Sequence, residues 1–529
     1  MEGCFSHTAV SPPRISKRRI QVCRWLGFGA CIPAMIVAGS VYAFNAYSDG
    51  LKTQLSLTQS QEEDLLSIGV VATCIGFTAG LLIEHFGLQL TATVAAITSF
   101  LGYLFMGLTL DGKVTRSYGF LAFSIFLTGQ GSIFFYMLSL MSTAVNFPLK
   151  VRGTMFGFLD AMYGGSATIW STIYGETFGK SNNAADQNVA GYLYTVGAAS
   201  AAAGLVCIVA VRHLPFDMDT SPASVPDKGT KQHAGIQQDG YTASSNSSRV
   251  PAAATNVEID DPLIDSGDGD ALLLSDSHGN SSTVPDDDDD HAQTQDKSLK
   301  QLVCSLDFHL LFWPFIMVSA MTTMFIANVT FYLKAFHLED EYRRLLTIMI
   351  PGLGLVFRII LGFTSDRTIK VIPRSFYISF TMCFLCVGLV LLRVKVGVVW
   401  VLMFNAVTMA LAAAGVWCLV PTVVTEISGV KSFGRVWGIV MLFSGATSVL
   451  YQVVFGRVYD AHVAEKPTPA PGLGIESSEP TPATCYGAQC FSASTDMILA
   501  SAIVSVCMIL SLAVRQWRGM RRVRHHIGD

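Results

Sequence analysis

The chain has 529 residues, of which 51% are hydrophobic and 14% charged, with a mean hydropathy of +0.45 and a net charge of −4. This composition excludes a water-soluble globule, and binding of nucleic acid is not expected. A helix needs about 20 apolar residues to cross roughly 30 Å of hydrocarbon. We therefore expect an all-α protein embedded in a lipid bilayer.

Hydropathy predicts twelve membrane spans in two sets of six, separated by a polar insert. The first span follows a basic segment, but its apolar run is too long for a cleaved signal peptide. The predicted spans are 25–47, 65–86, 89–110, 117–141, 153–175, 190–211, 308–331, 344–364, 375–392, 398–421, 434–457 and 495–514. The predicted domains are a cytosolic amino-terminal segment (1–24), a first six-helix bundle (25–212), a linker (213–304), a second six-helix bundle (305–515) and a basic cytosolic tail (516–529).

The linker is rich in Ser, Asp, Gly, Pro and Thr and contains five consecutive acids, Asp286–Asp290. Such a segment buries too little apolar surface to order itself, so we predict that it is disordered. Within it, Asp268, Leu272 and Leu273 fit the acidic dileucine pattern that vesicle adaptors bind. A vesicle adaptor is thus a candidate partner, and the alternative is a plain tether between the bundles.

The two sets of spans carry matching motifs at an almost constant offset. The carboxylate and glycine of one motif recur 282 positions later, and two glycines of another recur 281 positions later. The equivalent residues are Glu84 and Asp366, Gly80 and Gly362, Gly153 and Gly434, and Gly157 and Gly438. Six plus six helices related by duplication resemble the parallel-repeat plan of the major facilitator superfamily, so this is the fold we expect.

The distribution of Lys and Arg predicts the orientation. If both ends of the chain are cytosolic, the cytosolic side carries about twice as many basic residues as the opposite side, in keeping with the positive-inside tendency. The linker then lies in the cytosol as well. The basic tail, which includes Arg515 and Arg524, is expected to lie against anionic lipid headgroups.

Glu84 and Asp366 lie at the predicted cytosolic ends of spans two and eight. There, carboxylates can accept hydrogen bonds from the first-turn amides of neighbouring helices and hold that side closed. We expect basic residues of the same half to face each carboxylate, Lys150 and Arg152 in the first half, Lys431 and Arg435 in the second. The gate candidates are Glu84, Asp366, Arg152, Glu426, Lys431 and Arg435. The alternative is that they are ordinary interfacial charges kept in water.

Two charges lie deep within predicted spans. Arg358 is eight residues before Asp366, or about 12 Å inside the membrane at 1.5 Å per residue. Its guanidinium matches a carboxylate with two parallel hydrogen bonds, so Arg358 is the candidate substrate anchor; the alternatives are snorkelling to the interface and a structural ion pair. Asp160 is at similar depth on span five and is the candidate proton carrier, or else a structural acid.

Five uncharged polar residues in the spans are candidates for lining a substrate cavity: Tyr42, Asn45, Gln130, Asn328 and Asn405. The alternative for the amides is that they hold neighbouring helices together. Cys485 and Cys490 differ from the other cysteines because they precede the last span, on the predicted non-cytosolic side. With Gly487 between them permitting a turn, we predict a disulfide. No spacing of Cys and His resembles a metal site.

The stretch Asn146-Phe147-Pro148, followed by Arg152, Gly153 and Gly157, resembles the signature of the nodulin-like family of the major facilitator superfamily. Further similarities are Glu426–Gly429, Phe433-Gly434, Tyr459-Asp460 and the loop Cys485–Phe491. The resemblance implies the twelve-helix fold, and relatives include monocarboxylate carriers. At two points the chain departs from the family pattern: Leu88–Leu90 replace the expected basic pair, and Asp160 stands where lysine is expected.

We therefore expect a secondary active transporter that works by alternating access on small organic anions, monocarboxylates such as pyruvate or lactate, with proton coupling. No nucleotide-binding loop is present in the sequence, so neither a primary pump nor an enzyme is expected, and no cofactor. The alternatives are a carrier of amino acids, metal complexes or xenobiotics, or a non-transporting sensor that signals through the linker. A monomer in the plasma membrane or a vacuolar or lysosomal-type membrane is expected.

Overall fold

The computed structural model describes residues 17–181, 183–214, 299–336, 340–395, 397–464, 487 and 489–528. In this part of the chain the regular structure is entirely helical. Residues Met1–Met218 and Gln293–Asp529 form one compact unit, which contains both predicted bundles. Residues Asp219–Ala292 are a separate unit and lie outside the described residues.

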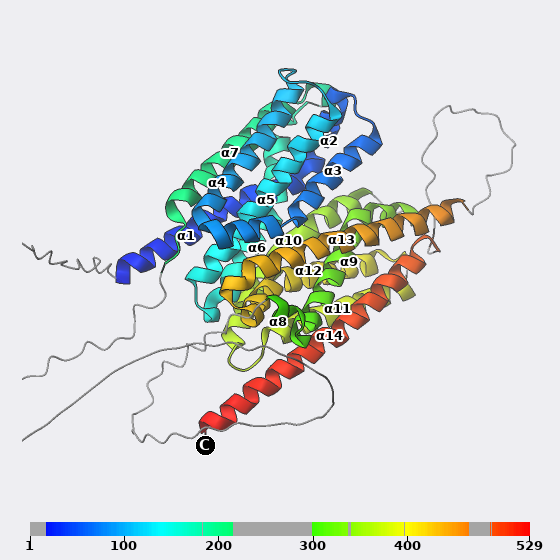
Figure 1. The fold of residues 1–529 in the computed structure, drawn as a ribbon. Helices are drawn as coiled ribbons and strands as arrows, with labels where there is room; N and C mark the ends of the chain where they lie inside the picture. The colour runs from blue at the N-terminus through cyan, green and yellow to red at the C-terminus, as the bar shows by residue number, and fades with distance from the viewer. Residues whose placement is uncertain are drawn as a thin grey trace, which may run out of the picture. The chain divides into compact units, whose positions relative to one another are not determined.

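The first set of helices runs from blue to teal in Figure 1. Its elements are α1 (Lys17–Ala38), the 3-10 turn η1 (Gly39–Ala43), α2 (Phe44–Leu55), α3 (Gln59–Cys74), α4 (Phe77–Leu110), α5 (Tyr118–Asn146), α6 (Leu149–Ile173), η2 (Tyr174–Phe178), η3 (Ala184–Asp186) and α7 (Val189–Ala210). Spans one and two are therefore each broken. A 3-10 turn interrupts the first, and Ile75–Gly76 interrupts the second.

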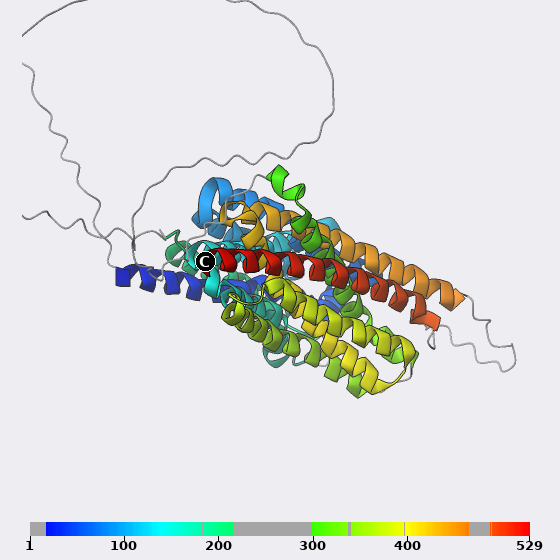
Figure 2. The same cartoon turned by 90° about the horizontal axis from the view of Figure 1, so that it is seen from below.

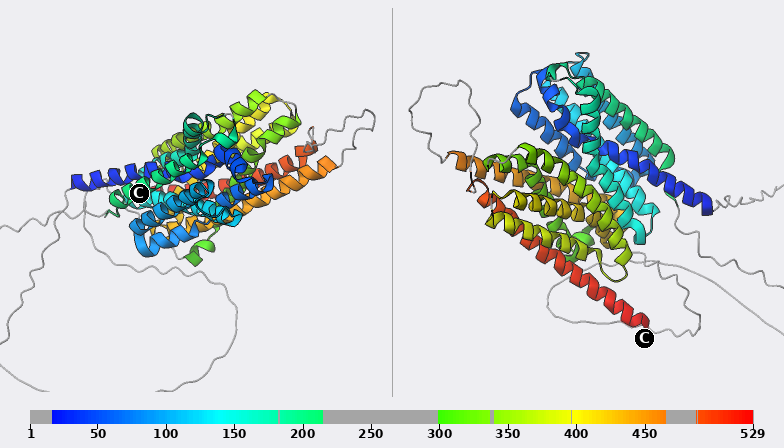
Figure 3. Two further views of the ribbon diagram at one scale, coloured as in Figure 1. Left: turned by 90° about the horizontal axis from the view of Figure 1, so that it is seen from above. Right: turned by 180° about the vertical axis from the view of Figure 1, so that it is seen from behind.

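The second set, green to red, lies beside the first in the front and rear views (Figures 1 and 3). Its elements are α8 (Leu299–Val303), α9 (Leu306–Ala335), α10 (Asp340–Thr368), α11 (Arg374–Val394), α12 (Val399–Ser428), α13 (Val430–Ala464) and α14 (Gln489–Gly528). Figure 2 shows α13 and α14 running alongside α11 and α12. The basic end of α14 continues the helix that precedes it rather than forming a separate tail.

Local sequence explains where several helices begin and end. Thr58 and Gln61 form a reciprocal capping box that starts α3 after Ser56 leaves α2 in a left-handed conformation. Pro148 and Pro373 precede α6 and α11, where a fixed φ and a missing N–H cost nothing. Gly87 has φ +81° and ψ 179°, and this turn splits α4 into the end of span two and the whole of span three.

Ten helical segments in the described residues are long and apolar enough to cross a membrane. One of them, Ser60–Leu110, contains two spans because of the turn at Gly87. The helix α6 is not among the ten, since Asp160 and several Gly, Ser and Thr residues lower its hydropathy. When the second span within Ser60–Leu110 and the helix α6 are counted, all twelve predicted spans are helical. The fourth span of each set, α5 and α12, is the most buried, 78% in its most apolar window.

Candidate functional site

The two sets of helices are joined near the points where α6 and α13 begin, by an ion pair at one point and by hydrogen bonds to a carboxylate at the other. On one side of the repeat, Arg435 of α13 donates from Nε to Oε2 of Glu84 on α4 at 2.8 Å, and a second contact joins its Nη2 to Oε1. Both side chains are about one third exposed. This pair connects the first set to the second.

The equivalent carboxylate of the second set, Asp366 on α10, contacts the first set. It accepts hydrogen bonds from the backbone N–H groups of Gly153 (3.1 Å) and Thr154 (2.6 Å), and from the Thr154 hydroxyl (2.7 Å). A carboxylate at the start of a helix also has a favourable interaction with the helix dipole. Since Gly153 corresponds to Gly434 in the repeat, the two contacts are related by the internal duplication.

Arg374 is the basic partner of Asp366, and sequence reasoning missed it. It is fully buried, lies 2.5 Å from Asp366, also pairs with Glu426 of α12, and donates to the carbonyl of Leu149 at 2.7 Å. A basic residue directly after Pro373, eight residues after the gate carboxylate, was the available signal. Arg374 was not among the predicted gate residues.

Two of the expected partners are placed differently: Arg435 pairs with Glu84 of the opposite half instead of Asp366. Arg152 does not meet Glu84: it is buried and donates to Thr425 of α12 (3.0 Å) and to the carbonyls of Ala144 and Phe147. Lys431 lies at the start of α13. The Glu84–Arg435 pair therefore joins the two sets. The pairs of Arg374 with Asp366 and Glu426 lie within the second set, and this cluster reaches the first set through hydrogen bonds with its backbone.

Glycines bring the backbones of the two sets into contact beside these pairs. A Cβ at Gly80 would overlap the carbonyl oxygen of Gly434, and one at Gly362 would lie 2.5 Å from that of Gly153. One turn further in, a Cβ at Gly157 would lie 2.6 Å from the carbonyl oxygen of Arg358. These distances leave no room for a side chain, so small residues are required for the close approach.

Asp160 and Arg358, which the sequence analysis treated separately, form one ion pair. Arg358 Nε on α10 lies 2.6 Å from Asp160 Oδ2 on α6, with the two side chains 14% and 2% exposed. The end of the guanidinium lies against Gly164. Asp160 and Arg358 thus form a buried ion pair with one charge from each set of helices.

Three tyrosines surround this pair on the side of the first set. Tyr163, one turn after Asp160, packs against Tyr136 of α5 and Tyr42 of η1, with ring centroids 4.8 and 5.7 Å apart. The Tyr163 hydroxyl donates to that of Tyr42 at 3.4 Å, and Tyr42 is 43% exposed. Among the predicted cavity residues, Tyr42 is thus linked to the ion pair through Tyr163, which lies one turn after Asp160.

The four predicted amides are placed differently. Asn45 is exposed on α2, and Asn328 donates to the carbonyl of Met324 in its own helix, α9. Gln130 is buried, donates to the carbonyl of Ala72 at 2.7 Å, and accepts from Thr78 at 3.4 Å. It therefore spans the break in span two, which fits the alternative of helix glue.

Asn405 is fully buried on α12 beside Gly388 of α11, and neither end of its amide has a hydrogen-bond partner among the described residues. Asn405 therefore lies between α11 and α12, whereas the Asp160–Arg358 pair lies between α6 and α10. The predicted cysteine pair and the dileucine motif lie outside the described side chains.

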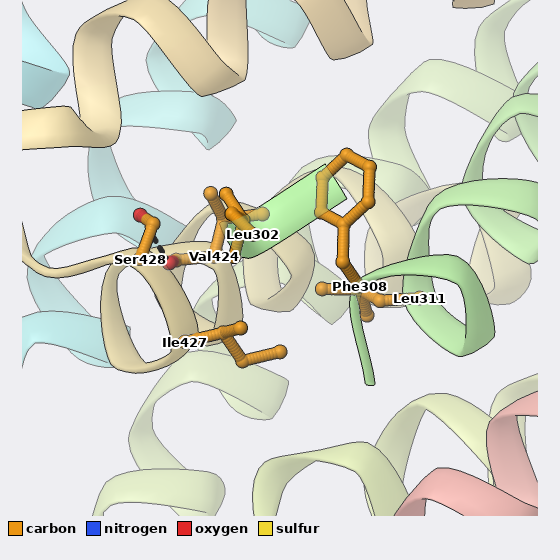
Figure 4. Close-up of a pocket in the computed structure, with 6 residues that line it drawn as sticks. All are labelled: Leu302, Phe308, Leu311, Val424, Ile427 and Ser428. Carbon is orange, nitrogen blue, oxygen red and sulfur yellow. Dashed lines mark hydrogen bonds between the residues drawn. The ribbon is translucent and has the colours of Figure 1, made fainter. Parts of the chain in front are cut away.

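One small crevice lies away from the ion pair (Figure 4). Its empty volume is about 140 Å³, and it lies where α8 and the start of α9 pack on the end of α12. The lining residues are Leu302, Phe308, Leu311, Val424, Ile427 and Ser428. An apolar lining with one hydroxyl offers nothing to bind an anion. The described residues contain no cluster of three or more His, Cys, Asp or Glu suited to a metal ion.

Comparison with known proteins gives one family match, since residues 24–228 fit the family model described as Nodulin-like. A probable transporter MCH1 of Yarrowia lipolytica is 28% identical over 155 residues, which are 28% of this chain and 30% of that protein. A probable transporter mch1 of Neurospora crassa is 30% identical over 104 residues, 20% of this chain and 16% of that protein. The chain thus matches less than a third of either relative's length.

Solved structures match almost the whole chain at low identity. The proton:xylose symporter XylE has a TM-score of 0.54 at 12% identity and covers 93% of this chain and 96% of its own. The fucose:proton symporter FucP of E. coli has 0.54 at 10%, covering 91% and 98%. The human organic anion transporter MFSD10 has 0.54 at 11%, covering 94% and 100%. At such identities the likeness shows the fold alone, which is the expected one.

Proposed function

We propose that the chain is a nodulin-like member of the major facilitator superfamily, as the family match over residues 24–228 and the fold support, and that it is a secondary active transporter of a small organic anion, moved together with a proton. The Asp160–Arg358 ion pair is the observation that carries the proposal. An ionisable group inside a membrane protein is by default a functional candidate. Here an acid from one set of helices faces a base from the other.

The pair suggests how a proton and an anion are coupled. While Asp160 is ionised, it neutralises Arg358, and burial disfavours a second anion nearby. A proton on Asp160 removes its charge and leaves the guanidinium to a substrate carboxylate, for which its planar fork is suited. The groups that face Asp160 from neighbouring elements are Arg358, Tyr42, Tyr136 and Cys418. None of them is another acid.

Alternating access follows from the contacts between the sets. The Glu84–Arg435 pair and the hydrogen bonds of Gly153 and Thr154 to Asp366, with the glycine contacts beside them, hold the two sets together at one end of the unit. When these contacts break, the two sets rock and expose the central pair to the other side of the membrane. Monocarboxylates such as pyruvate and lactate are the cargo we propose, since one arginine suits one carboxylate.

The test is uptake and counterflow in proteoliposomes, with a panel of monocarboxylates, an amino acid and a neutral sugar. Arg358→Lys keeps the charge but loses the fork, so the half-saturation concentration of a carboxylate should rise roughly ten- to hundredfold, equivalent to about 1.5–3 kcal/mol. Asp160→Asn should retain counterflow and lose uptake driven by a pH gradient. Arg393→Lys is the control, because Arg393 pairs with Asp496 in an exposed position.

Removing only one charge is a poor test, since the unpaired partner of a buried ion pair costs about 3–5 kcal/mol. The variant Asp160→Asn with Arg358→Gln leaves no unpaired buried charge and keeps two polar side chains that can bond each other, so it should fold like the parent and transport nothing. Carboxylate uptake by this double variant at the parent rate would disprove the proposed role of the pair. Uptake of the sugar but of no carboxylate would disprove the anion cargo.

A further inference from the structure

Two buried hydrogen-bond donors, one from each set of helices, lie beside each other, and neither has an acceptor in hydrogen-bonding geometry among the described residues. They are the hydroxyl of Tyr136 on α5 and the indole Nε1 of Trp437 on α13. Both side chains are fully buried. Buried polar groups in native proteins are nearly always satisfied, and an exception calls for a missing partner such as a ligand or water.

Both donors lie next to the Asp160–Arg358 pair. The Tyr136 ring packs on Tyr163, which follows Asp160 by one helical turn. Trp437 follows Phe433 by one turn, and Phe433 contacts Phe156, which precedes Asp160 by one turn, with ring centroids 6.0 Å apart. The two donors, one on α5 and one on α13, are therefore neighbours of each other close to the ion pair.

We propose that the Tyr136 hydroxyl and the Trp437 indole N–H are substrate donors that, together with the terminal nitrogens of Arg358, bind the anionic group of the cargo. This inference rests on the proposed function and deepens it. Arg358 supplies the charge, and the two neutral donors approach from opposite sets of helices. A bound anion therefore ties the two sets together, which is what an occluded, substrate-loaded state requires.

The surrounding groups also limit the rest of the substrate. The rings of Tyr42 and Tyr163 lie edge to face beside the pair, and together with Tyr136 they present apolar surface next to the proposed anion site. Aromatic faces favour an apolar or aromatic group and offer few partners to several hydroxyls. The substrate class is thus a monocarboxylate with a short aliphatic or aromatic remainder, rather than a sugar acid.

A conservative substitution separates a ligand role from a packing role. An unsatisfied hydroxyl in a protein interior is unfavourable, so Tyr136→Phe leaves the ligand-free protein as stable as the parent or more stable. If the hydroxyl binds the anion, the same change weakens binding. Tyr192→Phe is the matched control: its hydroxyl is also buried without an acceptor, but its ring packs on Tyr47, Trp170 and Tyr174.

The experiment measures the unfolding temperature of the purified full chain in detergent against lactate, pyruvate, benzoate and gluconate. Tyr136→Phe should raise the half-saturating carboxylate concentration roughly ten- to hundredfold, as expected for losing one hydrogen bond to a charged group. Trp437→Phe should do the same, and Tyr192→Phe should behave as the parent. The ligand-free Tyr136→Phe protein should unfold at the parent temperature or above.

Each other outcome counts against the proposal. If Tyr136→Phe binds carboxylates like the parent while Arg358→Lys does not, the donor role is wrong and the proposed transport function stands. If Tyr136→Phe both weakens binding and unfolds earlier without ligand, the hydroxyl is structural and the donor role is again wrong. If the parent responds to none of the carboxylates, the proposed anion cargo fails, and the donor role fails with it.

Discussion

Asp366 and Glu84 occupy equivalent positions in the two repeats, but their surroundings differ. Asp366 is 6% exposed and faces the fully buried Arg374, which also contacts Glu426. Glu84 and Arg435 are 29% and 35% exposed. A buried charge that loses its partner is costly, whereas a pair in contact with solvent is worth little. The two ion pairs are therefore of unequal strength.

We predict that Asp366→Asn destabilises the protein by about 3 kcal/mol, the lower end for losing one partner of a buried pair, because Glu426 still faces Arg374. Glu84→Gln should cost only about 0.2–1 kcal/mol, as expected for a pair open to solvent. The measurement is unfolding of both purified variants in one detergent. Equal losses, or a larger loss for Glu84→Gln, would contradict the difference in burial.

Glycine contacts between helices set how closely the two sets approach. Gly80 and Gly362 are related by the repeat. Each lies against the backbone carbonyl of a glycine near the start of a helix in the opposite set, Gly434 on α13 and Gly153 on α6. Neither has space for a Cβ. Because two backbones rather than two flexible side chains are in contact, the overlap is relieved only if a whole helix moves.

Gly80→Ala and Gly362→Ala should each shift the protein toward a state in which this end of the unit is open. Gly352→Ala is the control, since Gly352 lies on the same helix as Gly362 and has no atom within 4 Å of a Cβ placed there. Cys418 reports on the opening: it is buried, and its sulfur lies 3.4 Å from the carbonyl oxygen of Arg358.

The measurement is the rate at which a maleimide labels Cys418 when the exposed Cys304, Cys383 and Cys507 have been replaced by serine. Labelling should be faster in the two gate variants than in the parent and unchanged in Gly352→Ala. Faster labelling in Gly352→Ala alone, or in none of the three, would show that the glycine contacts do not limit opening.

The sequence predicted the elements of this fold better than the contacts between them. The predicted spans all lie in helices, because nearly all of them are local runs of apolar residues. The 3-10 turn Gly39–Ala43 inside span one was not foreseen, since it lies in the middle of such a run. The repeat predicted which residues are equivalent, but not that Glu84 meets Arg435: sequence spacing carries no information about which half faces which.

The central site shows the same limit. Depth along a helix follows from counting residues, so Asp160 and Arg358 were both expected inside the membrane. That they meet depends on how α6 packs on α10, nearly 200 positions apart in the chain (Asp160 to Arg358). Tyr136 and Trp437 gave no signal in the sequence, because an aromatic residue in an apolar span is ordinary core. The two residues matter because the Tyr136 hydroxyl and the Trp437 indole N–H have no acceptor in hydrogen-bonding geometry among the described residues.

At the scale of the whole molecule, an even number of spans places both ends of the chain on one side of the membrane. The excess of Lys and Arg predicts that this side, with the linker, is cytosolic. Tags at the two termini should therefore resist external protease in intact cells or sealed vesicles until the membrane is permeabilised. Cleavage of either tag beforehand would refute the orientation.

Alternating access also makes a prediction about which parts of the molecule move. Glu84 and Arg435 belong to different sets of helices, so cysteines at both positions, joined by a cleavable bifunctional maleimide, should hold this end closed. Uptake in proteoliposomes should fall to the level of empty vesicles and return when the linker is cleaved. The physical reason is that transport requires each set to move as a body against the other.

The control pair lies within one set. Arg393 of α11 and Asp496 of α14 also form an ion pair, 2.6 Å apart, but both helices belong to the second set. Cysteines at these two positions, joined by the same reagent, should leave uptake intact, because helices that move together do not need to separate. The parent treated with the reagent measures any effect on its native cysteines. Full uptake through a protein linked at Glu84 and Arg435 would mean that this contact stays closed during transport, and the rocking motion would have to open elsewhere.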